Sequence, residues 1–167
     1  SFHNDIVSLS NENIFIAHEK AFQDRNKLTK LLKNLEIKID NFQFIEISDS
    51  EIPLKNIIDS YLLNSQLATN GQNEMMLILP EEVKSYEACL AWLDKLKQIS
   101  DIKLYDFVNI RQSMMNGGGP ACLRLKVVLD EGEIKELNQN FLMTSDNLDA
   151  IKSLIEREYR DNLHPDD

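Results

Sequence analysis

Residues 116–125 read Asn-Gly-Gly-Gly-Pro-Ala-Cys-Leu-Arg-Leu, and the chain is organised around this stretch. Three successive glycines let the backbone reach positive φ and approach a ligand closely, and Pro120 restricts the exit from the turn. The apolar residues that follow alternate with other residues, which predicts a strand to about Leu129. Cys122 falls on the polar face of this strand, two residues before Arg124. The pattern leaves two roles open for Cys122, a small buried hydrophobe or a nucleophilic thiolate favoured by nearby positive charge.

The first half of the chain predicts a strand, turn, strand, helix and strand in that order. Two short strands are expected at residues 4–8 and 13–17, with a turn between them. An apolar stripe predicts a helix over about residues 19–35, and a strand follows near residues 41–48.

The second half repeats this order. A helix opened by Pro53 leads to strands at residues 65–69 and 74–79. A helix over residues 80–99 follows, with Cys89 on its apolar stripe, and then a strand over residues 102–108. The order strand, turn, strand, helix, strand thus occurs twice, which indicates a weak internal repeat.

The end of the chain predicts further helices and completes a mixed α/β (α+β) fold class. A short helix is expected over residues 130–137. Ser145 is a suitable N-cap for a closing helix to about Leu163, with Leu148, Ile151, Ile155 and Tyr159 facing inward.

Composition excludes several classes of function. The chain has 167 residues, 43% of them hydrophobic, and 28 acidic against 18 basic residues give a net charge of −10. This charge disfavours binding to nucleic acid, and no apolar run is long enough to span a membrane. The three histidines and two cysteines are too scattered for a metal site. Two cysteines without framework spacing favour a reducing, cytoplasmic setting.

His3 and Asp5 form the other candidate pair. If their segment is extended, both side chains point to the same side, where His3 would suit acid–base chemistry and Asp5 would suit a cationic group. By pattern alone a solvated chain terminus is the simpler interpretation of both, and Asn116 has the simpler interpretation of a turn residue.

Five segments resemble the N-succinylarginine dihydrolase family of the guanidino-modifying (pentein) superfamily, in the same order. The most specific is residues 112–125, which resembles the family's nucleophile segment, and Phe2-His3-Asn4-Asp5 resembles its histidine motif. The other three are residues 61–67, 77–82 and 159–163. The resemblance implies a pentein-type α/β-propeller, of which this chain would supply about two strand-strand-helix-strand modules and a C-terminal helix.

The resemblance also implies the chemistry. Cys122 and His3 would be catalytic, Asp5 and Asn116 would bind the substrate, and neither a metal nor an organic cofactor would be required. The implied reaction hydrolyses N-succinylarginine to succinylornithine, ammonia and carbon dioxide in arginine catabolism. The only implied ligand is this small molecule, without nucleic acid or membrane, and the full-length enzyme is expected to be a homodimer.

We expect residues 1–167 to be the C-terminal portion of a single propeller domain, with the family's catalytic carboxylate lying upstream. On that expectation this chain alone would have little or no activity. Two alternatives remain at this stage: a non-catalytic binding or interaction domain with the pentein fold, and another guanidine-modifying hydrolase or amidinotransferase. Retention of both His3 and Cys122 disfavours the binding domain.

Overall fold

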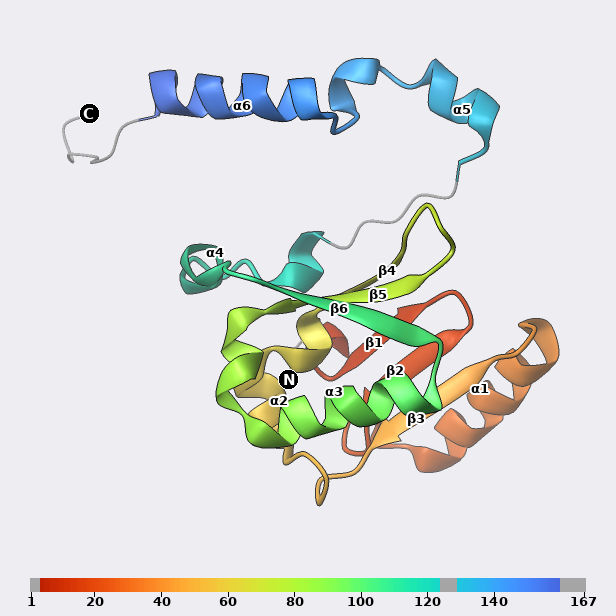
Figure 1. Cartoon of the computed structure of the whole chain (residues 1–167). Helices are drawn as coiled ribbons and strands as arrows, with labels where there is room; N and C mark the ends of the chain where they lie inside the picture. Colours follow the sequence, from red (N-terminus) through yellow and green to blue (C-terminus); the bar gives the residue numbers. More distant parts are fainter. Residues whose placement is uncertain (1–3, 124–128, 160–167) are drawn as a thin grey trace. The chain divides into compact units, whose positions relative to one another are not determined.

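The computed structural model describes residues 4–123 and 129–159. The chain divides into two compact units, with the division after residue 125. The first unit holds two three-stranded sheets, and the second is helical in its described part (Figure 1). The fold class is therefore mixed α/β, as the sequence predicts, and across the described residues the sheets do not close into a barrel.

The first sheet is built from one strand–turn–strand–helix–strand module. Strand β1 (Ser8–Asn11) pairs antiparallel with β2 (Ile14–His18), and β2 pairs parallel with β3 (Gln43–Ile47). The parallel pair needs a crossover connection, which helix α1 (Arg25–Lys38) supplies.

The second sheet has the same topology, so the internal repeat is confirmed as a repeat of structure. Strand β4 (Gln66–Thr69) pairs antiparallel with β5 (Met75–Pro80), and β5 pairs parallel with β6 (Ile102–Val108). The crossover contains a 3-10 helix, η3 (Glu81–Ser85), and helix α3 (Glu87–Ile99).

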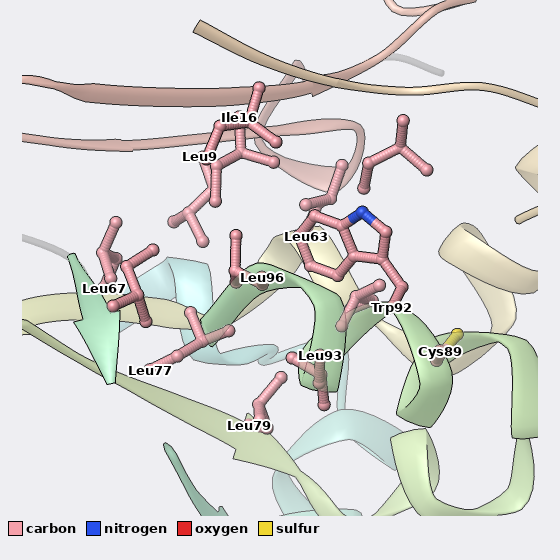
Figure 2. Close-up of a cluster of buried hydrophobic side chains, with 14 of the residues drawn as sticks. Leu9, Ile16, Leu63, Leu67, Leu77, Leu79, Cys89, Trp92, Leu93 and Leu96 are labelled. Carbon is pink, nitrogen blue, oxygen red and sulfur yellow. The ribbon is translucent and has the colours of Figure 1, made fainter. Parts of the chain in front are cut away.

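The two modules share one hydrophobic core (Figure 2). Strands of both sheets contribute to it, as Leu9 and Ile16 do from the first sheet and Leu77 and Leu79 from the second. Helix α3 covers this core with Trp92, Leu93 and Leu96, all at most 2% exposed. Cys89 of the same helix is fully buried, which confirms its predicted place on the apolar stripe.

Two short elements connect the modules. Helix α2 (Leu54–Ser60) ends at Tyr61, whose φ of 58° is left-handed and turns the chain sharply. The 3-10 helix η2 (Leu62–Asn64) follows and leads directly into β4. In the first module the 3-10 helix η1 (Asn4–Ile6) precedes β1 in the same way.

At three places an element begins at another residue than the sequence predicts, and a local hydrogen bond or backbone conformation accounts for each. Residues 4–6 form η1 instead of a strand, and the amide of Val7 donates to the carbonyl of Asn4 at 3.1 Å. Helix α1 begins at Arg25, not near residue 19, since Asp24 caps it by accepting from the amide of Lys27 at 2.9 Å. Helix α3 begins at Glu87 because Tyr86 is extended and separates it from η3.

The second unit contains two α-helices among its described residues. Helix α5 (Glu131–Glu136) carries a capping box between Asp130 and Glu133. Helix α6 (Ser145–Glu158) is capped by Thr144, one residue before the predicted Ser145. The apolar side chains expected to face inward from this helix are 40–73% exposed: Leu148, Ile151, Ile155 and Tyr159. No helix within residues 4–123 and 129–159 is long and apolar enough to cross a membrane.

Candidate active site

The glycine run ends a helix. Helix α4 (Arg111–Met115) stops at Asn116, and Gly117 takes a φ of 85°, the left-handed conformation that glycine adopts without a Cβ penalty. The amide of Gly118 donates to the carbonyl of Ser113 at 2.9 Å, and the amide of Gly117 donates to the carbonyl of Met114 at 3.0 Å. These two bonds form a Schellman motif, which satisfies carbonyls left open at the helix end.

Cys122 lies in a 3-10 helix, η4 (Pro120–Leu123), so the strand predicted from residue 121 is wrong over residues 121–123. The amide of Cys122 donates to the carbonyl of Gly119 at 3.1 Å, which closes the turn that replaces the strand. The Cys122 side chain is exposed. The rest of the predicted strand up to residue 128, including Arg124, lies outside the described residues.

Asp5 and Cys122 line the same cavity, which has a volume of about 160 Å³. The other lining residues come from η1, from the α2–η2 connection and from the glycine run: Ile6, Tyr61, Asn64, Gly117 and Gly119. Asp5 also lines a second cavity of about 370 Å³, together with Ala121 and residues of β1 and β2. The structure thus brings the Asp5 segment and the Cys122 segment together although the two residues are 117 positions apart in sequence.

Of the other two predicted site residues, only Asn116 is described by the structure, and it is not among the residues that line this cavity. His3 lies outside the described residues. Asn116 is next to Gly117, but its side-chain amide donates to the carbonyl of Gln112 at 3.0 Å, one turn back along α4. The assumption of an extended chain around Asp5 does not hold, because Asp5 is in a 3-10 helix, where residues three apart share a face.

Asn64 is the residue that the sequence analysis did not identify. It is 4% exposed, and its side chain contacts the backbone of both site segments. The sequence carried one signal for it, because Asn64 directly follows the apolar pair Leu62 and Leu63. A buried polar side chain in such a run requires hydrogen-bond partners.

The two cysteines have opposite surroundings. Burial raises the pKa of the Cys89 thiol, against a smaller opposing effect of the hydrogen bond with Ser60, whose Oγ lies 3.7 Å from Sγ. A buried, protonated thiol is a poor nucleophile. Cys122 is the exposed thiol, at the cavity, so position and exposure both favour it over Cys89.

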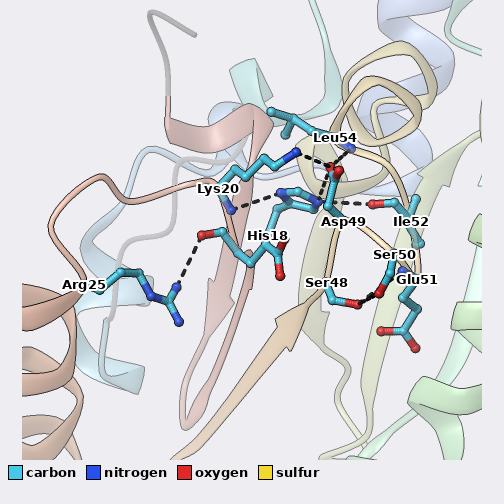
Figure 3. A network of polar contacts seen from close by, with 10 residues as sticks. His18, Lys20, Arg25, Ser48, Asp49, Ser50, Glu51, Ile52 and Leu54 are labelled. Carbon is cyan, nitrogen blue, oxygen red and sulfur yellow. Dashed lines mark hydrogen bonds and ion pairs between the residues drawn. The ribbon is translucent and has the colours of Figure 1, made fainter.

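His18 is buried at the end of β2 (Figure 3). Its Nδ1 accepts from the amide of Lys20 at 3.2 Å, so the proton sits on Nε2, 3.1 Å from the carbonyl of Ile52. Asp49 lies alongside, with Oδ1 3.6 Å from Nε2. The side chain of Lys20 and the backbone amide of Leu54 both donate to Asp49 and lower the pKa of its carboxyl group. These bonds tie β2 to the start of α2, which is a structural role.

Among the residues that the structure describes, no three histidine, cysteine or acidic side chains gather closely enough to hold a metal ion. In comparison with known proteins, the model of the succinylarginine dihydrolase family matches residues 1–167. The match therefore covers Cys122, Asp5, Asn116 and Asn64 together.

Proposed function

The chain belongs to the succinylarginine dihydrolase family, and on that premise we propose that it carries the nucleophile of a hydrolase acting on the guanidinium group of N-succinylarginine. The observation that carries this proposal is the cavity of about 160 Å³ that Cys122 and Asp5 line together. A carboxylate beside an exposed thiol suits a substrate whose reacting carbon is part of a cation.

The size of this cavity fits the proposed reaction. A water molecule takes up about 30 Å³ in the liquid, so the space corresponds to a few heavy atoms and fits a planar guanidinium group. The rest of the substrate needs more room. The adjoining cavity of about 370 Å³ shares Asp5 and is lined by Ala121, the neighbour of Cys122.

In the proposed mechanism the Cys122 thiolate attacks the guanidinium carbon and forms a C–S bond. His3 gives a proton to one terminal nitrogen, the C–N bond breaks, and ammonia leaves. His3 then takes a proton from water, the hydroxide attacks the same carbon, and the C–S bond breaks to restore the thiolate. Asp5 and Asn116 hold the substrate. A second cycle on the resulting ureido group, with a second water, gives another ammonia, carbon dioxide and succinylornithine.

The remaining proposals concern the setting of this chemistry. We propose that residues 1–167 form the C-terminal portion of an α/β-propeller catalytic domain, which the repeated module supports. The proposed cytoplasmic location is supported by Cys89 and Cys122, both free thiols. A homodimeric full-length enzyme remains a proposal from the family resemblance.

The test is ammonia release from N-succinylarginine by the full-length native protein. We expect two ammonia molecules and one succinylornithine per substrate, and we expect Cys122→Ser to abolish turnover. Cys89→Ala is the matched control, because it removes the other thiol from a site outside the cavity, and it should retain activity. No turnover by the native protein would overturn the proposed function, and turnover by Cys122→Ser would overturn the role of Cys122. A non-catalytic binding domain would bind N-succinylarginine without releasing ammonia.

A further inference from the structure

The side chain of Asn64 joins the two segments that form the cavity. Its Nδ2 donates to the backbone carbonyl of Asp5 at 3.3 Å, across 59 positions of sequence. Its Oδ1 accepts from the backbone amide of Ala121 at 3.1 Å, across 57 positions. One buried side chain therefore connects the residue that carries the candidate carboxylate with the neighbour of the candidate nucleophile.

The peptide group between Pro120 and Ala121, one residue before Cys122, is hydrogen-bonded at both ends. The amide of Ala121 donates to Asn64, and the carbonyl of Pro120, in the same peptide group, accepts from Nε2 of Gln66 at 3.3 Å. Asn64 and Gln66 lie on either side of Ser65, where η2 passes into β4. Two side chains from one short segment thus fix the orientation of the peptide plane from which the Cys122 segment continues.

The backbone is shaped to admit Asn64. A Cβ on Gly119 would lie 2.3 Å from Asn64 Oδ1, so the glycine run approaches this side chain more closely than any other residue type permits. The backbone of Asn64 is fixed as well. Tyr61 is left-handed, and the backbone amide of Asn64 donates to the Tyr61 carbonyl at 3.0 Å, so that η2 is held in place.

An asparagine is chemically suited to this place. The carbonyl of Asp5 requires a donor and the amide of Ala121 requires an acceptor, and a carboxamide offers one of each. It does so without adding a net charge to a site where Asp5 already carries one. A leucine of similar size would leave both half-buried backbone groups without this bond.

We propose that Asn64 is a positioning residue, which holds Asp5 and the Cys122 thiol at a fixed separation across the cavity. The assignment rests on the proposed function, since it matters only if both residues act on one substrate. Reaction rates depend steeply on such geometry, and a displacement of about 1 Å can cost about a hundredfold in rate.

The first test compares Asn64→Ala with Asn11→Ala in the full-length native protein. Asn11 is a fair control because it is also buried, and its Nδ2 also reaches across to the second module, where it contacts Thr69 Oγ1 at 3.0 Å away from the cavity. We expect Asn64→Ala to lower kcat by about ten- to a hundredfold and to change the rate of Cys122 alkylation by iodoacetamide. Asn11→Ala should leave both unchanged, while the two variants show similar losses in Tm.

A second variant separates positioning from simple loss of stability. In Asn64→Asp the carboxyl group mimics the carboxamide only when protonated, because the protonated acid again offers one donor and one acceptor. The ratio of the kcat of Asn64→Asp to that of the native protein should therefore rise as pH falls. The same ratio for Asn64→Ala should stay flat.

The inference is overturned if Asn64→Ala matches Asn11→Ala in kcat and in Cys122 alkylation, or if the Asn64→Asp ratio does not change with pH. If the native protein releases no ammonia, the proposed function fails instead. In that case the alkylation comparison still tests whether Asn64 positions the Cys122 segment.

Discussion

Gly119→Ala tests whether the glycine run is required for its close contact with Asn64. The added Cβ would lie 2.3 Å from Asn64 Oδ1 and 3.2 Å from Asn64 Cγ and from Tyr61 Cδ1, whereas ordinary contacts begin at 3.4 Å. Either the two segments must separate or the Asn64 side chain must shift, in each case by roughly 1 Å. The clash involves the acceptor atom of the bond to Ala121, so separation breaks that bond.

The cost of Gly119→Ala has two parts. Forcing an extra methyl into a packed site typically costs about 1–3 kcal/mol. Loss of the half-buried hydrogen bond from the Ala121 backbone amide to Asn64 costs up to about 3 kcal/mol more. We expect the free energy of unfolding to fall by about 2–5 kcal/mol in total. Gly71→Ala is the control, because nothing lies within 4 Å of its added Cβ, and its effect should stay within about 1 kcal/mol.

The assay is equilibrium unfolding in urea, followed by circular dichroism and by the fluorescence of Trp92, the single tryptophan, which lies in the shared core. The slope of free energy against urea should be the same in all three proteins, so that the midpoints report stability alone. Equal midpoints for Gly119→Ala and Gly71→Ala would refute the reasoning, since they would show that the Asn64 contact carries no energetic constraint.

Two further predictions follow from the thiols and from the network around Asp49. Iodoacetamide at neutral pH should label Cys122 more than about tenfold faster than Cys89, whose thiol is buried and has a raised pKa; peptide mapping that finds comparable labelling would contradict the assignment. The pKa of Asp49 is lowered in the folded state by Lys20 and by the amide of Leu54, so its stabilising effect is full above the unfolded pKa of about 4 and is lost as pH falls through the folded value. Asp49→Asn should therefore lower the urea midpoint at pH 7, and the difference should fade in acid; a constant difference from pH 7 to the acid limit would contradict this sign.

The sequence predicted those elements in which a regular apolar pattern continues over many residues and local residues mark the ends. Strand β6 has its predicted bounds. Cys89 lies in the core because the apolar stripe of α3 is buried. The stretch after Pro120 shows the opposite case. Its alternation is typical of a strand, yet residues 121–123 form a turn, and the bonds that hold it come from Asn64 and Gln66, more than 50 positions away. No local pattern contains that information.

The same limit explains what was found and missed at the site. Cys122 and Asp5 were candidates because of their residue types, in motifs that resemble the family's, and both line the cavity. Asn64 was missed because a carboxamide is neither a nucleophile nor an acid or base, and its partners here are two backbone groups far away in sequence. Only the folded chain brings η1 and η4 to the two ends of its side chain.

The cavity depends on 3-10 helices in place of the expected strands. Its lining includes Asp5 and Ile6 from η1, Asn64 from η2 and Cys122 from η4. A strand commits its amides and carbonyls to neighbouring strands, whereas the ends of a short 3-10 helix leave several of them open. The carbonyl of Asp5 and the amide of Ala121 are therefore available to a side chain, and Asn64 uses both. The 3-10 helices η1 and η2 hold equivalent places, before β1 and before β4. The second of them, η2, carries Asn64, whose side chain bonds to the backbone of η1 and of η4.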